Sequence, residues 1–347
     1  MPTVLEPRSA TSGLPTSRVP RRSSAALVVA IVIALGLVIT RVVSSAVVPA
    51  GVLPNRLQDG LTLGMSVLIE SLPFVILGIV ISIAVRVWLP DGVFVRVLPR
   101  SPWLRRILIS FVGMLLPVCE CGNVPLARGL MVRGLTVAES MTFLFAAPIL
   151  NPITVITTAQ AFGWSGGILV ARIAGGFFIA NLLGWVFSRH PNPESLLTPR
   201  FAAECRLPAH EEHGTRWNRS VQLFSTEAAN LLPALFVGSV AAAGVQTLVP
   251  RSILVALGTD PIWSVVAMIG LSFIISVCST VDAFFILPFA TTFLPGSITA
   301  FLVFGAMIDI RMIALLRTTF STRTIIQLFA VILLATAALS WLVNLVA

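Results

Sequence analysis

The sequence predicts an all-α polytopic membrane protein with two inverted repeats of transmembrane helices, which contain broken or re-entrant helices and follow one extra N-terminal helix. The chain has 347 residues, of which 56% are hydrophobic and only 11% are charged, whereas a soluble domain carries about 25% charged residues. Five long runs contain no charged side chain: 140–171, 228–250, 261–281, 283–308 and 324–347. Because about 20 apolar residues span a bilayer, these runs indicate a polytopic helical membrane protein.

The excess of basic residues does not indicate a nucleic-acid partner. The formal net charge is +9, and all 23 basic residues are arginines. Most of them lie in short stretches between apolar segments, which is the pattern that keeps cationic loops in the cytoplasm. We therefore expect the lipid bilayer and a small-molecule substrate as partners, and no nucleic acid. The arginine distribution places the N-terminus in the cytoplasm and the C-terminus outside, and a homo-oligomer is left open.

Hydrophilic stretches divide the chain into five parts. Residues 1–24 are rich in Pro, Ser, Thr and Arg and are predicted to be a disordered cytoplasmic tail. Residues 25–49 are predicted to be an uncleaved membrane anchor helix. The first transmembrane repeat occupies 61–188, a hydrophilic cytoplasmic linker occupies 189–219, and the second repeat occupies 220–347.

Three landmarks occur in the same order in both halves of the chain. Pro73 and Gly78 recur as Pro233 and Gly238, LLPVCECG falls opposite ISVCSTVD, and APILNP falls opposite GAMIDI, at offsets of 158 to 160 residues. The arginine distribution starts the first repeat outside and the second inside, so the halves are predicted to be inverted. Inverted repeats with broken helices that meet at a midplane site are typical of secondary transporters.

The stretch PVCECGNVPLARG, residues 117–129, combines helix breakers with polar side chains and thiols. Pro117, Gly122 and Pro125 are predicted to unwind the helix, and free backbone groups at membrane depth are tolerated only inside protein or beside a water-filled cavity. A simple structural kink is the alternative.

A second break is predicted in AAPILNP, at Pro148 and Asn151. Segments 103–118 and 122–134 form either two crossings or one re-entrant hairpin, which the short second piece favours. The hairpin interpretation gives seven full spans plus two hairpins, and the alternative gives eleven spans.

The membrane cysteines suggest the chemistry of the site. Cys119, Cys121 and Cys278, together with Glu120, are predicted to bind the substrate, because thiolates select soft, thiophilic metals and a trivalent arsenical would bind thiols for the same reason. The C-x-C spacing differs from the C-x-x-C redox pattern. The alternative is that these cysteines pack as small hydrophobic residues. Neither a resident metal ion nor another cofactor is predicted.

Ionisable residues inside membrane segments are functional hypotheses by default. Glu70, Asp282, Asp309 and the polar Asn151 are predicted to serve ion coupling or gating. Asp282 lies four residues after Cys278, so on a helix the two would share a face.

Two arginines and one loop complete the charged and metal-binding candidates. Arg172 interrupts an apolar helix and needs a partner that the sequence does not name. Arg311 is a candidate partner for Asp309, unless that carboxylate lies at the cytoplasmic end of its helix. In the linker, Cys205 and the histidines at 210 and 213 match no closed zinc motif, so we interpret them as solvated.

The motifs PVCECGNVPLARGL, FAAPILNPITVI, SVCSTVDAFF and AFLVFGAMIDIRM resemble the predicted-permease family that includes the ArsP-type organoarsenical efflux permeases. The resemblance covers roughly residues 60–345. It implies a plasma-membrane efflux permease for trivalent methylated or aromatic arsenicals, with Cys119 and Cys121 as thiol ligands and Cys278 as a weaker candidate. In the family a serine usually separates the two cysteines, whereas this chain has Glu120. That carboxylate changes the charge of the site and leaves a cationic substrate open.

We therefore expect an integral membrane permease, not an enzyme, that carries out secondary, ion-coupled efflux of a thiophilic small molecule such as a trivalent organoarsenical. The sequence contains no G-x-x-x-x-G-K motif followed by Ser or Thr, which argues against ATP-driven transport by this chain alone. Three alternatives stay open: a membrane thiol oxidoreductase that uses Cys119 and Cys121, a passive metal or anion channel, and a non-catalytic membrane subunit.

Overall fold

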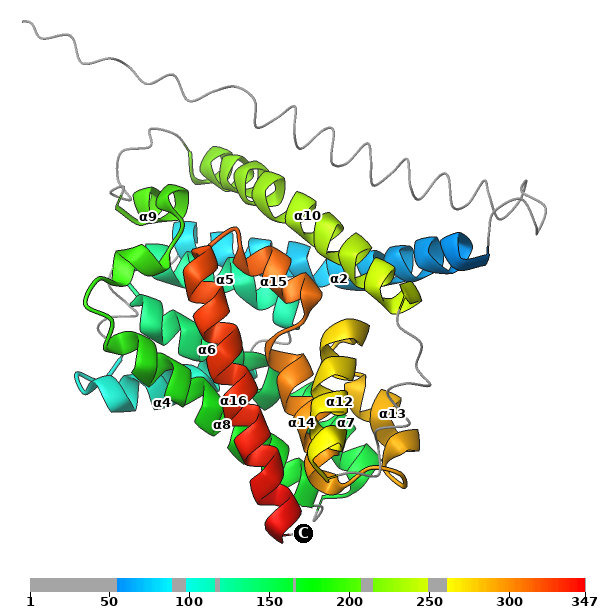
Figure 1. Cartoon of the computed structure of the whole chain (residues 1–347). Coiled ribbons are helices and arrows are strands. Elements are labelled where there is room, and N and C mark those ends of the chain that lie inside the picture. Colours follow the sequence, from blue (N-terminus) through cyan, green and yellow to red (C-terminus); the bar gives the residue numbers. More distant parts are fainter. Residues whose placement is uncertain are drawn as a thin grey trace, which may run out of the picture.

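The computed structural model describes residues 55–88, 98–115, 119–164, 167–206, 215–248 and 261–346, and every regular element within these ranges is a helix (Figure 1). The all-α prediction is confirmed. The predicted tail, the anchor helix and Pro117 lie outside the described residues.

The first half contains five α-helical regions whose bounds follow the apolar segments of the sequence. They are α2 (Asn55–Ile83) with the π-helical turn η1 (Ala84–Trp88), α4 (Pro102–Val112) with the 3-10 turn η2 (Gly113–Leu115), α5 (Glu120–Val132), α6 (Val137–Leu150) with α7 (Pro152–Phe162), and α8 (Gly167–Ser188). The linker adds η3 (Pro193–Leu196) and α9 (Pro199–Arg206).

The second half follows a comparable order of long and short helices. Its elements are α10 (Arg216–Leu248), α12 (Pro261–Ile275), α13 (Asp282–Ile286) with η4 (Leu287–Phe289), α14 (Pro295–Met307) with α15 (Ile310–Leu316), and α16 (Thr322–Val346). Helices α2 and α10, each with an internal proline, pack against each other, and α12 packs on α14 (Figure 1). The similar order agrees with a duplication, and the inverted orientation of the halves stays a prediction.

Five helical stretches among the described residues are long and apolar enough to cross a bilayer: Thr62–Trp88, Gly167–Ser188, Arg216–Gln246, Pro295–Leu316 and Thr322–Val346. Helices α6 and α7, bent by 40° at Asn151, can form a sixth span. The chain is therefore a multi-pass membrane protein. Helix α5 has 13 residues and so covers about 20 Å, which is less than a hydrocarbon core of about 30 Å. This length favours a re-entrant segment over a full crossing.

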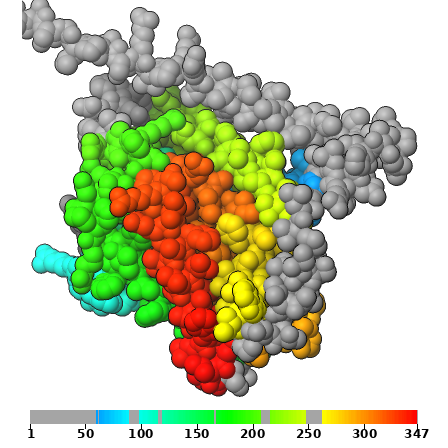
Figure 2. Space-filling model, viewed as in Figure 1, coloured from blue at the N-terminus to red at the C-terminus, as the bar shows by residue number. Residues whose placement is uncertain are grey.

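The short helices form the interior, and the long helices surround them. Nearly every residue of α5, α6 and α14 is buried, whereas α8, α10 and α16 expose large apolar side chains such as Phe178, Val237 and Leu334. Figure 2 shows one face of the molecule with α16 in red beside α12 in yellow. Apolar side chains on the outside suit a bilayer, and the buried ionisable residues lie inside the protein.

Three of the residues predicted to break helices lie inside helices in the structure. Gly122 and Pro125 lie inside α5, and Pro148 lies inside α6, so the prediction that these three residues unwind the backbone is wrong. A proline removes one main-chain hydrogen bond and can kink a helix without ending it. The second break lies at Asn151, whose side chain accepts a hydrogen bond from Ile153 N at 3.0 Å and caps α7.

Part of the hydrophilic linker is packed. The Phe201 side chain on α9 is 1% exposed, and Leu197 forms a bridge with Phe320 ahead of α16. Burial raises the pKa of Cys205 to about 11, so its thiol stays protonated near neutral pH and is a poor metal ligand. The histidines at 210 and 213 lie outside the described residues.

Glycine is required where α2 meets the first turn of α5. A Cβ atom placed on Gly78 would lie 2.2 Å from the carbonyl oxygen of Gly122, a distance that side chains cannot adopt. The close approach brings the first turn of α5 directly against α2, and this contact positions the residues at the start of α5.

We predict that Gly78→Ala lowers the free energy of unfolding by about 1–3 kcal/mol or more, because the extra methyl group forces two packed backbones apart. Thermal unfolding of the purified chain in detergent measures the effect. Gly270→Ala in α12 is the matched control, since a Cβ atom there meets nothing within 4 Å. Equal unfolding midpoints for the two variants would contradict the close-approach explanation.

Candidate substrate site

The first part of the site is the N-terminus of α5. Cys119 is the N-cap residue in an extended conformation, with φ −74° and ψ 175°, and Glu120 is the first helical residue. Cys119, Glu120 and Cys121 are 3%, 2% and 1% exposed. The first amide groups of a helix have no intrahelical partner and carry partial positive charge. This end of α5 therefore favours a carboxylate or a thiolate.

The second part is a non-helical segment between α12 and α13. Helix α12 ends at Ile275 and α13 begins at Asp282. Ser276 has a φ angle of 52°, which lies in the left-handed region. Residues other than glycine adopt this region rarely, and mostly where surrounding contacts impose it. Cys278 follows this turn and is 3% exposed.

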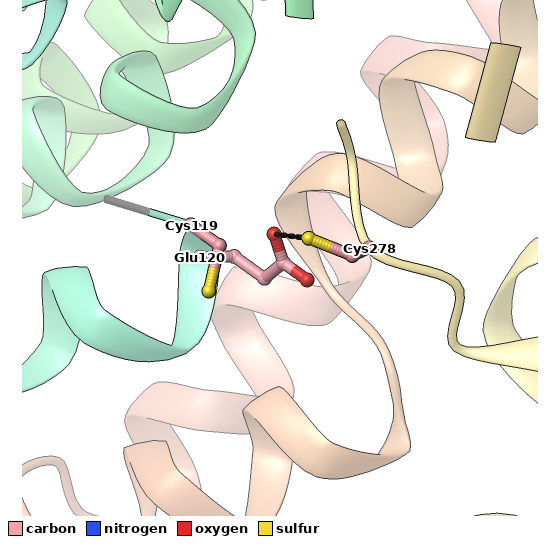
Figure 3. A group of neighbouring side chains, drawn as sticks. All are labelled: Cys119, Glu120 and Cys278. Atoms are coloured by element: carbon pink, nitrogen blue, oxygen red, sulfur yellow. Dashed lines mark hydrogen bonds between the residues drawn. The ribbon is translucent and has the colours of Figure 1, made fainter. Parts of the chain in front are cut away.

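The two parts bring thiols from both halves of the chain together. The Sγ atoms of Cys119 and Cys278 and a carboxylate oxygen of Glu120 all lie within 4.8 Å of one another (Figure 3). The Cys278 thiol donates to Glu120 Oε2 at 3.8 Å, and Cys121 follows Glu120 in the first turn of α5 and is buried. The structure thus brings together the four residues predicted to bind substrate. We call these four residues the thiol cluster.

Glu120 links the thiol cluster to buried charges. Its Oε2 atom accepts a hydrogen bond from Ser279 Oγ at 3.1 Å, and its Oε1 atom lies 3.7 Å from Arg311 Nη2. Arg311 in turn pairs with Asp309 at 3.2 Å, which confirms one of the two interpretations of that carboxylate. Asp309 also caps α15 through a hydrogen bond from Met312 N at 2.6 Å.

Asp282 is the partner of Arg172. Arg172 Nη1 donates to Asp282 Oδ1 at 2.9 Å and Nη2 donates to Oδ2 at 2.6 Å, a bidentate geometry. Arg172 also donates to Thr158 Oγ1 at 2.7 Å. Cys278 precedes α13 by one turn, and the Asp282 N–H donates to the Cys278 carbonyl at 3.1 Å. The two side chains nevertheless contact different partners, since Cys278 bonds to Glu120 and Asp282 to Arg172.

The same two arginines hold the main chain of the non-helical segment. The Ser276 carbonyl accepts a hydrogen bond from Arg311, and the Ser279 carbonyl accepts one from Arg172 Nη2 at 3.3 Å. Backbone groups without helical partners are costly inside a membrane. The two guanidinium groups satisfy two of these carbonyls.

Glu70 and Asn151 lie at other places. Glu70 is exposed on α2, three residues before Pro73, and Asn151 is buried at the cap of α7. Both stay predictions as ion-coupling or gating residues.

Sequence reasoning missed a four-membered network of buried charges. Arg86 lies 2.9 Å from Glu204 and 3.0 Å from Glu227, and Arg128 lies 3.0 Å from each of the same two glutamates. Arg128 also donates to the Thr318 carbonyl at 3.1 Å. The network joins η1, α5, α9 and α10. One residue in the sequence could have indicated this network. Arg128 is a charge inside a short membrane segment, where it must have a buried partner.

Comparison with known proteins agrees with this architecture. A family model described as a predicted permease matches residues 56–345. The chain belongs to this predicted-permease family. It is 32% identical to the UPF0718 protein YcgR of Bacillus subtilis (strain 168) over 285 residues, which cover 81% of this chain and 95% of the relative.

Two further relatives extend the family assignment. The chain is 32% identical over 280 residues to a putative two-component membrane permease complex subunit of Streptococcus mutans, covering 79% of this chain and 91% of the relative. It is 24% identical over 193 residues to the UPF0718 protein YraQ of Escherichia coli (strain K12), covering 53% of each. No solved structure gives a significant match to the chain.

We predict that Asp282→Asn destabilises the permease by about 3–5 kcal/mol, because it leaves the Arg172 guanidinium buried without its counter-charge. Unfolding of the purified variant in detergent measures the loss. The double variant Arg172→Met with Asp282→Leu removes both charges and should regain much of the lost stability. A double variant at least as unstable as the single one would show that the ion pair is not the source of the effect.

Proposed function

We propose that this chain is a secondary efflux permease for a thiophilic small molecule, such as a trivalent organoarsenical, and that the thiol cluster is its substrate site. The observation that carries the proposal is the convergence of thiols from both halves of a permease-family chain on buried, partly non-helical backbone. Transport sites of inverted-repeat transporters are built in this way from discontinuous helices.

The chemistry of a trivalent arsenical matches the thiols. Each arsenic–sulfur bond replaces an arsenic–hydroxyl bond, and the thiol proton leaves with the hydroxide as water. Cys119 and Cys278 can supply two such bonds, and Cys121 lies next to Cys119 as a third donor. All three are free cysteines. Because Cys119 and Cys278 belong to different halves, a relative movement of the halves would separate them and release the substrate.

Transport is coupled to protons or another ion, and the buried carboxylates are the proposed coupling and gating groups. Asp309 pairs with Arg311, which lies 3.7 Å from Glu120. Asp282 pairs with Arg172, which also binds the Ser279 carbonyl, and the Ser279 hydroxyl donates to Glu120. A change of charge on either carboxylate would alter the hydrogen bonds that hold the 276–282 segment. Glu70 and Asn151 complete the proposed set. The proposed location is the plasma membrane, with the N-terminus inside.

The relative from Streptococcus mutans supports a second possibility, since its name describes a subunit of a two-component complex. In that case this chain would need a partner for transport. Reconstitution of the purified chain alone separates the two possibilities.

We predict that proteoliposomes containing only this chain take up a trivalent phenylarsenical when a proton gradient is imposed. Cys119→Ser and Cys278→Ser should each lower the uptake rate by about tenfold or more. A tenfold loss corresponds to about 1.4 kcal/mol of substrate binding. Uptake of radiolabelled or mass-detected arsenical, with and without the gradient, is the measurement. Cys205→Ser is the matched control because Cys205 lies on α9, outside the thiol cluster.

Uptake by Cys119→Ser at the wild-type rate would rule out the thiol cluster as the arsenical site. Activity that appears only after a second component is added would favour the subunit interpretation. Reversible oxidation of Cys119 and Cys121, detected as loss of alkylation, would favour a thiol oxidoreductase. Flux that is electrogenic and independent of the gradient would favour a channel.

A further inference from the structure

The thiol cluster contains a donor that a neutral arsenical does not use. The Glu120 carboxylate is within hydrogen-bonding distance of the Cys278 thiol and within 4.8 Å of the Cys119 sulfur. Arsenic in a trivalent organoarsenical carries no charge and prefers sulfur, so an adjacent carboxylate contributes little to its binding. A metal cation gains from the same carboxylate both a ligand and a counter-charge.

The spacing of the donor atoms fits a tetrahedral metal ion. With a metal–sulfur bond of about 2.3 Å and a metal–oxygen bond of about 2.1 Å, sulfur and oxygen ligands lie about 3.6 Å apart. Cys278 Sγ and Glu120 Oε2 are 3.8 Å apart, and all three donor atoms lie within 4.8 Å of one another. The three donor atoms therefore need to approach one another by about 1 Å at most to surround one ion.

The buried charges around the cluster leave a negative balance. Asp309 and Arg311 neutralise each other at 3.2 Å, and Arg172 and Asp282 do so at 2.6 Å. Among the described residues of the site this leaves the formal charge of Glu120. Arg311 lies farther from Glu120, at 3.7 Å, than from Asp309. A buried uncompensated charge is costly. A divalent ion that replaces the two thiol protons leaves the formal charge of the cluster unchanged, but it places positive charge directly against the carboxylate and so lowers the local cost.

The groups around the donors orient them for a metal ion. Ser279 Oγ donates to the Glu120 carboxylate at 3.1 Å, and Thr280 Oγ1 donates to Cys278 Sγ at 3.4 Å. Hydrogen bonds of this kind fix the direction of metal ligands. Cys119 is the N-cap of α5, so its side chain starts from the backbone position that directly precedes Glu120.

We propose that the substrate of the thiol cluster is a divalent thiophilic cation of the Zn²⁺ or Cd²⁺ class, bound by the thiolates of Cys119 and Cys278 and the carboxylate of Glu120. On binding, the two thiols release two protons to water as two metal–sulfur bonds form. The inference rests on the proposed function, because it assigns the ion as cargo of the same site and not as a resident cofactor. Three protein ligands leave one position of a tetrahedral ion open, which allows the ion to exchange.

The test uses the full chain in lipid nanodiscs and Cd²⁺ as the probe. We expect saturable binding of one Cd²⁺ per chain with a sulfur-to-cadmium charge-transfer absorption, competition by Zn²⁺, and none by Mg²⁺, which prefers oxygen ligands. Glu120→Gln keeps the shape of the side chain and should weaken Cd²⁺ binding by about tenfold or more, the effect expected for a lost ligand or its orienting partner. Cys278→Ser should lower the charge-transfer absorption, and Cys205→Ser should not.

No Cd²⁺ binding to the wild-type chain would overturn the inference, as would wild-type affinity in both Glu120→Gln and Cys278→Ser. Elution as a single monodisperse peak shows that each variant is folded, and Glu120→Ser serves as a second variant at the same position. Parallel uptake assays with Cd²⁺ and a phenylarsenical separate this inference from the proposed function. Arsenical uptake without Cd²⁺ binding would overturn only the assignment of a cation as substrate. Cd²⁺ binding without uptake of either solute would support the metal site and overturn the proposed permease function.

Discussion

The geometry of the site depends on two buried arginines that hold the main chain between α12 and α13. In a bilayer, a helix satisfies its own amide and carbonyl groups, and a non-helical segment needs other partners. Here Arg311 binds the Ser276 carbonyl and Arg172 binds the Ser279 carbonyl. Cys278 lies between these two anchored residues, so its thiol has a defined direction toward Glu120. Without the arginines, the segment would lose both the hydrogen bonds and the position of its cysteine.

Each buried arginine needs a carboxylate as counter-charge: Asp282 pairs with Arg172, and Asp309 pairs with Arg311. Helix α5 carries further members of such ion pairs. Glu120 at the first position of the helix faces Arg311, and Arg128 two turns later binds Glu204 and Glu227. Glu204 belongs to the linker and Glu227 to α10. A single short helix thus connects the thiol cluster with a charged network that includes the linker and the second half. Glu120 and Arg128 are eight residues, or about 12 Å, apart on the same helix. A displacement of α5 would therefore change the thiol cluster and the charged network together.

The sequence predicted those features that depend on local pattern. Apolar runs identified the helices, the Asn-Pro pair identified the bend at Asn151, and the recurrence of Cys119 as Cys278 indicated that these thiols belong to one site. Contacts between distant residues that the repeat does not relate could not be predicted. Arg172 and Asp282 are separated by 110 residues, and neither position indicates the other.

The misplaced breaks have a local cause. A count of breakers in PVCECGNVPLARG does not show that the helix begins immediately after Cys119. The main chain of Gly122 lies in the first turn of α5 and is the part of that helix that Gly78 on α2 approaches. Pro125 removes only one hydrogen bond from a helix that is buried along most of its length.

Glu120 is the charged member of the thiol cluster, and its energetics bear on what the site binds. Moving a carboxylate out of water costs several kcal/mol after relaxation, and the nearest guanidinium, that of Arg311, is already paired with Asp309. A serine at this position would avoid the cost but would remove the carboxylate that accepts from the Cys278 thiol. The carboxylate is therefore an unfavourable choice for stability and for binding a neutral substrate. The Ser279 hydroxyl and Arg311 lower this cost in part. A metal ion bonded directly to the carboxylate would lower it further, which is why the proposed site favours a cation over a neutral thiophile.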